Sequence, residues 1–236
     1  MLKLSSFVLL LILSLSPLSA SAAPAPLKDV VAALEKGYSA LQDVQADFSQ
    51  KTTIAAVGRE QKGGGDVMLK RPASATAMFR FNYTKPKQQI ISNGKQVWFY
   101  AVDNKQVMVN SVSTMFAGGN SIALTYLTGI GHVSRDFNVT FAAEPQDKSG
   151  NYQLELTPKK PSAALSRLQL TVLADAVEQL RSSGEVKNVF PVVSSVVHDA
   201  AGNQTRIDYS RTRVNKGLSD GKFNFKIPEG VQVIKQ

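Results

Sequence analysis

Groups that perform acid–base, nucleophilic or metal chemistry are sparse in this sequence and do not gather. His132 and His198 are the only two histidines, and neither has a second kind of ligand at the spacing of a zinc site. Asp175 and Glu178 form an acidic pair, but a solvated helix face explains them better than acid–base work. The chain lacks Cys, a G-x-S-x-G motif and a P-loop. We therefore expect no enzyme activity, no metal and no cofactor; a hydrolase would need a nucleophile–base pair that the sequence does not offer.

Arg71 is a charged residue within an apolar pattern. In the stretch DVMLKR (66–71), Val67, Leu69 and Arg71 fall on one face of a predicted strand. A charge on an interior face is costly unless hydrogen-bond partners meet it. Two interpretations stay open from the residues alone. Arg71 either reaches solvent from the end of the strand or binds acceptors inside the molecule.

Large apolar side chains crowd the neighbouring stretch 78–100. Phe79, Phe81 and Tyr83 alternate with the residues of the other face, which is the period of a strand. An Ile-Ile pair and the run VWFY follow, each after a short polar turn. The pattern fits two structures. One is the filled core of a sandwich, and the other is the wall of a cavity that holds an apolar ligand.

The elements that must position these residues are mostly strands. One helix comes first, because apolar residues recur at steps of three and four from Leu27 to Leu41, and it should end near Asp43. From Val44 the apolar period changes to two, and strands of about six residues follow with turn residues between them. The run Gly63–Gly65 is expected to form a turn or a bulge. This pattern predicts an antiparallel sheet or barrel.

Two stretches interrupt the strands. Residues 111–135 place apolar side chains at helical steps, which predicts one or two short helices. Residues 174–190 are more polar and predict one or two helical turns. Further on, residues 201–203 are typical of a hairpin turn, and residues 223–227 place alternate apolar side chains on one face. No repeat or linker divides the chain, so we expect a single domain that is mostly β with helices (α+β).

The first residues have the pattern of a secretory leader. An apolar run follows Lys3, and Ala20-Ser21-Ala22 matches the small-residue pattern of a cleavage site. We therefore expect a signal peptide over residues 1–22 and one domain over residues 23–236. An uncleaved anchor is the alternative, although the apolar run is shorter than the roughly 20 residues of a membrane span.

Charge and the lack of cysteine bear on compartment and partners. An exported chain without Cys forms no disulfides, so its fold must depend on its core alone. The formal net charge is +9, and the basic residues are scattered. In an exported protein this favours acidic partners or an anionic membrane surface over nucleic acid. A solvated surface without such a partner is the alternative.

Five blocks of the sequence, taken together, resemble the outer-membrane lipoprotein carrier family. In chain order they are VQADFSQ (44–50), LKRP (69–72), FRFNYTKP (79–86), ISNGKQVWFY (91–100) and FNFKIPEGVQVI (223–234). Each block is a weak signal alone, but their order and spacing match across nearly all of the mature chain. The resemblance implies an incomplete antiparallel β-barrel with a helical lid over an apolar cavity. The sequence departs from the family at residues 174–190, which we interpret as an insertion.

The resemblance also implies roles for single residues. The arginine of the KRP block, Arg71, would hydrogen-bond to the lid when the cavity is closed. We expect its acceptors to be backbone carbonyls of residues 111–135, because the last carbonyls of a helix lack partners within the helix. The predicted lining is Phe48, Val67, Leu69, Phe79, Phe81, Tyr83, Ile90 and Ile91, the last two matching one aliphatic position of the family with a one-residue ambiguity. The predicted lid helix carries Ile122, Tyr126, Leu127 and Ile130.

The function implied by the resemblance is transport of lipoproteins through the periplasm. Such a chaperone accepts acylated lipoproteins from an inner-membrane ABC transporter complex and delivers them to an outer-membrane acceptor. We expect a monomer that binds no nucleic acid. Shielding is needed because each CH₂ of an acyl chain contributes about 0.8 kcal/mol when it leaves water. The alternative is a carrier of the same fold for another lipid or a glycolipid, or an envelope-stress sensor.

Overall fold

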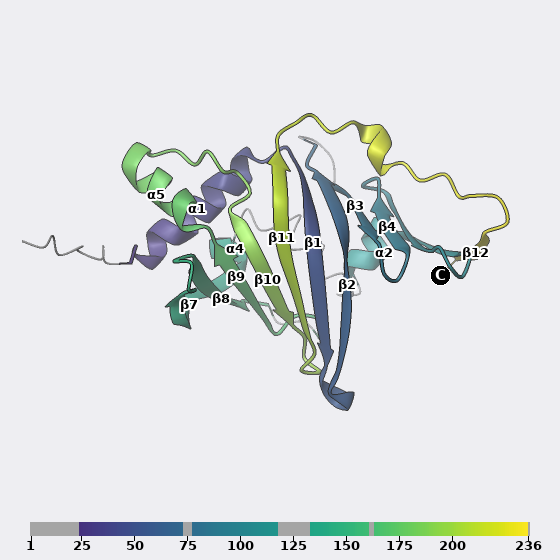
Figure 1. The fold of residues 1–236 in the computed structure, drawn as a ribbon, viewed down its shortest axis with the longest axis horizontal. Helices are drawn as coiled ribbons and strands as arrows, with labels where there is room; N and C mark the ends of the chain where they lie inside the picture. The colour runs from purple at the N-terminus through teal and green to yellow at the C-terminus, as the bar shows by residue number, and fades with distance from the viewer. Residues whose placement is uncertain (1–23, 73–76, 118–132, 161–162, 236) are drawn as a thin grey trace, which may run out of the picture.

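The computed structural model describes residues 24–72, 77–117, 133–160 and 163–235. The predicted signal peptide, residues 1–22, lies outside this part and stays a prediction. The same holds for the four predicted lid residues Ile122, Tyr126, Leu127 and Ile130. What the structure describes is a 12-stranded sheet with helices packed on it, as Figure 1 shows.

The sheet contains most of the regular structure that the structure describes. Its strands are β1 (Asp43–Ile54), β2 (Arg59–Lys70), β3 (Met78–Tyr83), β4 (Gln88–Ser92), β5 (Gln96–Ala101), β6 (Gln106–Ser111), β7 (Phe137–Gln146), β8 (Tyr152–Pro158), β9 (Arg167–Val172), β10 (Val192–His198), β11 (Gln204–Val214) and β12 (Gln232–Lys235). The helices are α1 (Leu27–Ala40), α2 (Val112–Ala117), α4 (Val133–Asp136) and α5 (Ala174–Ser183), with 3-10 turns η1 (Ala55–Val57) and η3 (Asp220–Phe223).

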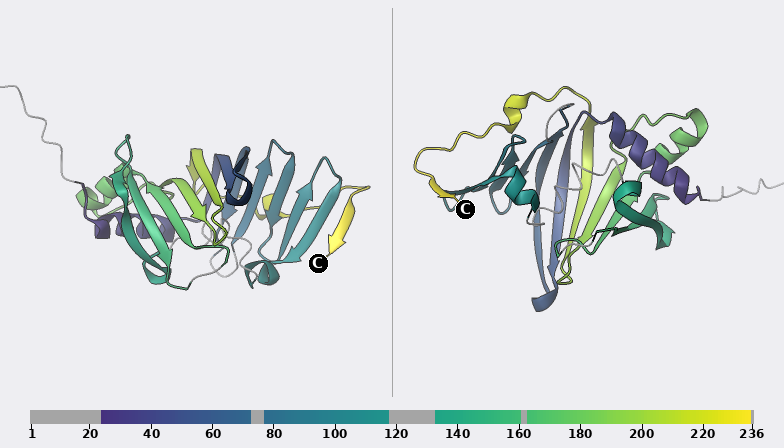
Figure 2. Two further views of the ribbon diagram at one scale, coloured as in Figure 1. Left: turned by 90° about the horizontal axis from the view of Figure 1, so that it is seen from below. Right: turned by 180° about the vertical axis from the view of Figure 1, so that it is seen from behind.

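The strand order is β12-β6-β5-β4-β3-β2-β1-β11-β10-β9-β8-β7. Every neighbouring pair is antiparallel except β12 with β6, which run parallel. The sheet curves strongly but its edge strands β12 and β7 do not pair with each other (Figure 2). The predicted incomplete antiparallel barrel is therefore confirmed. The hairpin predicted at residues 201–203 is also present, between β10 and β11.

The two faces of the sheet carry different clusters. We call the face that carries Phe79 and Phe81 the inner face; its buried side chains extend without a break from β7 to β5 and include those of α1, α2 and α4. Figure 2 shows these three helices on the same side of the sheet. The opposite, outer face carries a small cluster of Ile91, Trp98 and Val107.

Helix α1 forms because its apolar residues lie on one stripe. Val30, Leu34 and Tyr38 are fully buried in the inner cluster, while Lys28 and Lys36 on the other side are exposed. The helix ends at Ala40, slightly earlier than predicted, so that its last turn stands beside the start of β1. Most of its stability comes from this packing, because a helix of this length is marginal alone.

One other expectation needs correction. The glycine run 63–65 lies inside β2 and forms no turn.

The C-terminal stretch 223–234 crosses the outer face before it forms β12 from Gln232. Phe225 and Ile227 pack there against the outer cluster. The ring of Phe225 lies 6.1 Å from that of Trp98, measured between centroids. The segment therefore covers the back of the sheet before it supplies the last strand.

Candidate functional site

The predicted aromatic row lies on the inner face near the centre of the sheet. Phe79 and Phe81 of β3 stand directly across from Leu69 and Val67 of β2. Phe48 of β1 lies edge-on to Phe81, with 5.4 Å between the ring centroids. All five side chains are buried in one apolar cluster. The structure therefore brings together most of the residues predicted as lining, and it packs them in one layer.

Tyr83 extends this row toward the end of β3 and adds one polar atom. Its ring packs edge-on against Phe48 at 4.9 Å, and its hydroxyl donates to Oε1 of Gln50 at 2.8 Å. Burial raises the pKa of Tyr83 to about 12, so the phenol stays protonated at neutral pH. Gly65 stands across from both rings, and a Cβ there would collide with the carbonyl oxygen of Asn82. The glycine run thus allows a close approach of β2 and β3.

Ile90 and Ile91 lie on opposite faces of β4. Ile90 stands across from Phe81 and Phe99 and packs against the inner cluster. Ile91 stands across from Trp98 and belongs to the outer cluster. Since side chains alternate along a strand, only one of the two can face inward. Ile90 is therefore the aliphatic residue on the lining face, and the expectation for Ile91 is corrected.

An apolar pocket of about 190 Å³ opens beside this row, at the β12 end of the sheet. Its lining is Gln88, Gln89, Ile90, Phe99, Tyr100, Ala101, Gln106, Met108 and Ile234. Ile234 comes from the last strand, so the C-terminus contributes to this part of the inner face. A second groove of about 520 Å³ runs between α1 and β7 and is lined in part by Leu27, Val31, Phe137 and Val139. Both hollows are continuous with the apolar cluster and offer space to an apolar ligand.

Arg71 lies just beyond β2, beside the turn that joins α1 to β1. Its backbone N–H donates to the carbonyl of Gln42 at 2.8 Å, and its guanidinium Nη1 donates to the carbonyl of Tyr38. Tyr38 is in the last turn of α1, and its carbonyl also accepts from the backbone N–H of Leu41, the residue that follows the helix, at 3.2 Å. The acceptor is thus of the predicted kind, a carbonyl near a helix C-terminus, but the helix is α1. Bonding of Arg71 to residues 111–135 stays a prediction, because most of that stretch lies outside the described residues.

A second polar contact ties α1 to the end of the stretch 111–135. Oε1 of Glu35 accepts from the N–H of Ser134 at 2.9 Å and from its hydroxyl at 2.6 Å. Ser134 belongs to α4, and its carbonyl accepts from Nζ of Lys159 at 2.9 Å. Sequence analysis missed Glu35, because it is one of two acidic residues in α1 and lies among its polar side chains. Nothing in the local pattern indicates a partner that is 99 residues away.

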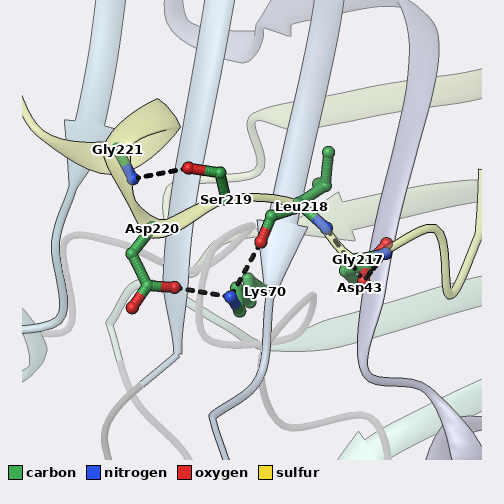
Figure 3. A network of polar contacts seen from close by, with 7 residues as sticks. All are labelled: Asp43, Lys70, Gly217, Leu218, Ser219, Asp220 and Gly221. Carbon is green, nitrogen blue, oxygen red and sulfur yellow. Dashed lines mark hydrogen bonds and ion pairs between the residues drawn. The ribbon is translucent and has the colours of Figure 1, made fainter.

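Asp43 anchors the C-terminal segment to the start of β1 (Figure 3). This carboxylate is only 3 % exposed and accepts from the N–H groups of Lys216, Gly217 and Leu218 at 2.9, 2.9 and 3.2 Å. Nζ of Lys70 donates to the carbonyl of Leu218 at 2.7 Å and pairs with Asp220. The network holds the segment where it leaves β11 and begins to cross the outer face. Sequence analysis missed it as well, since its partners are far apart in the chain.

The described residues offer no constellation for catalysis or metal binding. No group of three or more His, Asp or Glu side chains in the described ranges could hold a metal ion. His198 lies at the end of β10 beside Arg167, and its pKa is lowered first by burial and then by that guanidinium. His132 falls outside the described part of the chain. Of the helices that the structure describes, none is long and apolar enough to cross a bilayer.

Comparison with known proteins gives a consistent result. A family model described as "Outer membrane lipoprotein carrier protein LolA" matches residues 39–226. The outer-membrane lipoprotein carrier protein of Chromobacterium violaceum is 30 % identical over 214 residues, which are 90 % of this chain and 90 % of the relative. That of Hahella chejuensis is 28 % identical over 231 residues, which are 97 % and 98 % of the two chains.

Among solved structures, an uncharacterized conserved protein from Thermus thermophilus shares the fold. Its TM-score is 0.50 at 13 % identity, and the match covers 89 % of this chain and 98 % of that chain. At this identity the likeness concerns the fold alone, and it agrees with the open, curved sheet described above. The family model spans the central aromatic row, Arg71 and the segment that Asp43 anchors. This chain belongs to the outer-membrane lipoprotein carrier (LolA) family.

Proposed function

We propose that this protein is a periplasmic chaperone that shields the acyl chains of lipoproteins between the inner membrane and an outer-membrane acceptor. Membership of the LolA family supports a lipoprotein cargo. The donor is an inner-membrane ABC transporter complex, and the acceptor is a protein at the outer membrane. The chain acts as a carrier and not as an enzyme, and it needs no cofactor.

The observation that carries the proposal is the unbroken apolar inner face. It extends from β7 to β5, and polar contacts such as those of Arg71 with Tyr38 and of Glu35 with Ser134 lie at its edge. A ligand with long alkyl chains needs a large apolar surface with few polar groups, and this face provides one. The half-buried side chains of Ile90, Phe99 and Met108 mark where such a ligand has room to enter.

Release is the second requirement of a carrier. Because each CH₂ contributes about 0.8 kcal/mol, several acyl chains would bind too tightly unless the empty state is also stabilised. The bond from Arg71 to the carbonyl of Tyr38 serves this purpose, since a hydrogen bond to a charged group contributes about 1.5–3 kcal/mol. Bonding of Arg71 to the lid residues would add to it. Closure of the empty molecule then helps to expel the cargo.

Partner docking is the third requirement. The full sequence has a net charge of +9, and loss of Lys3 with the leader leaves the chain basic. This charge favours acidic docking surfaces on the partners, because complementary charge raises the association rate more than the affinity. We infer that the protein acts as a monomer in the periplasm after removal of residues 1–22. N-terminal sequencing of the periplasmic fraction checks this step, and a full-length protein embedded in the membrane would contradict it.

Depletion of the protein in its native cell tests the function directly. Lipoproteins of the outer membrane should then accumulate in the inner membrane when the two membranes are separated. An unchanged distribution would refute the proposal. Mass spectrometry of material that co-purifies with the protein distinguishes the alternatives, because triacylated peptides or proteins support the lipoprotein carrier, whereas a free lipid or glycolipid supports a different cargo.

A further inference from the structure

The segment 174–191, which contains the stretch 174–190 interpreted above as an insertion, lies beside α1. Helices α5 and α1 lie side by side in Figure 1 and in both views of Figure 2. Ala176 and Val177 of α5 are fully buried in the inner cluster, and Leu180 packs against it. Helix α1 therefore has a partner in α5 as well as in the sheet.

The chain after α5 presses directly on the middle of α1. A Cβ at Gly37 would lie 3.1 Å from Cδ of Pro191 and 3.3 Å from the carbonyl oxygen of Asn188. Both distances are shorter than ordinary van der Waals contact, so only glycine fits this position of the helix without displacement of the neighbours. Glycine lowers helix propensity, and its presence in mid-helix indicates that the close contact matters more here.

One aromatic side chain of the segment links α1 to the sheet. Phe190 is buried between Tyr38 of α1 and Tyr209 of β11, with ring centroids 5.6 and 5.4 Å away. Tyr38 is also the residue whose carbonyl accepts from Arg71. The residue that receives the bond of Arg71 is thus held in place by the segment 174–191.

Polar contacts fix the same segment at three points. Nζ of Lys36 donates to the carbonyl of Gly184, and Arg181 lies 3.7 Å from the carboxylate of Asp29. At the two ends of the segment, the N–H of Leu173 donates to the carbonyl of Pro191 at 2.9 Å. This bond joins the points where the segment leaves and rejoins the sheet. The exposed ion pair contributes little by itself. The burial of Phe190 and the contact at Gly37 therefore carry most of the attachment.

We propose that the segment 174–191 is a clamp that keeps α1 seated on the sheet while the cavity is filled and emptied. Helix α1 then stays packed on the sheet throughout loading and release. The bonds that Arg71 and Ser134 make with α1 break on loading and form again on release. The contacts that form the clamp are those of the protein without ligand. The role of the clamp during loading rests on the proposed carrier function.

Hydrogen exchange of the α1 amides tests the clamp in the full mature chain. In the unchanged protein, the amides of residues 30–38 should exchange slowly, and binding of a triacylated peptide should leave their rates within about twofold. In a variant that joins Leu173 to Pro191 through a two-residue turn, the same amides should exchange about tenfold faster or more. The bond between these two residues makes the short turn geometrically suitable.

A second variant covers the case in which the shortened chain fails to fold. Gly37→Leu raises the intrinsic helix propensity, so faster exchange in α1 would come from steric displacement by the new side chain, whose Cβ already lies too close to Pro191 and Asn188. Glu178→Ala on the exposed side of α5 is the matched control and should leave α1 unchanged.

The outcomes separate the clamp from the carrier function. Loss of α1 protection when the unchanged protein binds the triacylated peptide would overturn the clamp, and so would slow exchange of the α1 amides in both the shortened chain and Gly37→Leu. Failure of the peptide to bind at all would count against the proposed cargo. The comparison of the empty proteins would still decide whether the clamp exists.

Discussion

The two halves of the inner face are filled in different ways. Over β7–β11, α1 supplies Val30 and Leu34 to a layer that also contains Leu154 of β8, and all three are fully buried. Over β1–β6, the sheet supplies its own aromatic residues, and Ile90 and Phe99 remain half-buried beside an apolar pocket. The first half is mainly a packed core with one groove at its edge, between α1 and β7, whereas the second is an apolar surface with a pocket beside the aromatic row.

The difference indicates that one part of the sheet stabilises the fold and another part binds the ligand. A surface that must accept and release a ligand cannot also be the main source of stability, because stability requires permanent packing. The half under α1 provides this packing, and α5 reinforces it. Substitutions under α1 should therefore change the free energy of unfolding, while substitutions over β3–β6 should mainly change binding.

The largest effect is expected for Leu34→Ala in α1. Loss of a fully buried leucine leaves a cavity and should lower the free energy of unfolding by about 2–5 kcal/mol. Urea denaturation followed by circular dichroism measures it. Ile90→Ala, in the other half, should cost clearly less. Equal losses at both positions would show that the two halves contribute alike to stability.

Ile90→Glu should abolish most of the binding of an acylated peptide while the protein stays folded. A carboxylate on the inner face must either be desolvated by the ligand or exclude it, and a loss of affinity of about a hundredfold is expected. Val109→Glu is the matched control, because Val109 is also half-buried but faces outward, against the outer cluster. Displacement of an apolar fluorescent probe measures both. Similar affinities for the two variants would show that the inner face is not the binding surface.

Arg71→Leu should load normally but release its cargo about tenfold more slowly or worse, since a charge-assisted hydrogen bond of about 1.5–3 kcal/mol no longer stabilises the empty state. The added apolar side chain also favours the loaded state. Transfer of a radiolabelled lipoprotein to purified acceptor measures release. Arg59→Leu, at an exposed hairpin tip, is the control. Normal transfer by Arg71→Leu would refute the role of the bond.

The smallest effect is expected for Tyr83→Phe. It removes the hydrogen bond to Gln50 and should lower the free energy of unfolding by about 0.5–1.5 kcal/mol at neutral pH. The pKa of Tyr83 is raised from 10.0 to about 12, so its contribution is present below pH 10 and is lost as the pH rises through about 12. The decline of stability across this range should be shallower in Tyr83→Phe, as urea titrations at several pH values can establish. A parallel decline in both proteins would contradict the assignment.

Local patterns in the sequence were sufficient for the sheet and for the aromatic row. The alternation at Phe79, Phe81 and Tyr83 fixes one face of β3 whatever its neighbours do. It does not show which side chains of β4 face inward. Ile90 and Ile91 are the same residue type, and the register of β4 depends on the turn between β3 and β4. The glycine run in β2 was misjudged because a strand accepts glycine where another backbone approaches closely, as Asn82 does.

Long-range partners could not be predicted. Arg71 shares a strand face with Val67 and Leu69, which indicates that it needs an acceptor, but the helix end that lies beside it depends on how β1 and β2 place α1. Glu35 and Asp43 bond to residues 99 and about 173 positions away, and no spacing rule covers such separations. Residues 174–190 were interpreted only as an insertion, because the proposed role of the segment 174–191 depends on the packing of Gly37 and Phe190.

The parallel pairing of β12 with β6 has a consequence for the order of folding. Gln232 pairs with Gln106, 126 residues earlier in the chain, so the β6 edge of the sheet stays open until the last residues arrive. Contacts of such separation form slowly, and an open strand edge invites pairing with another molecule. A chain that loses its last few residues would therefore keep most of its core and yet tend to self-associate through β6.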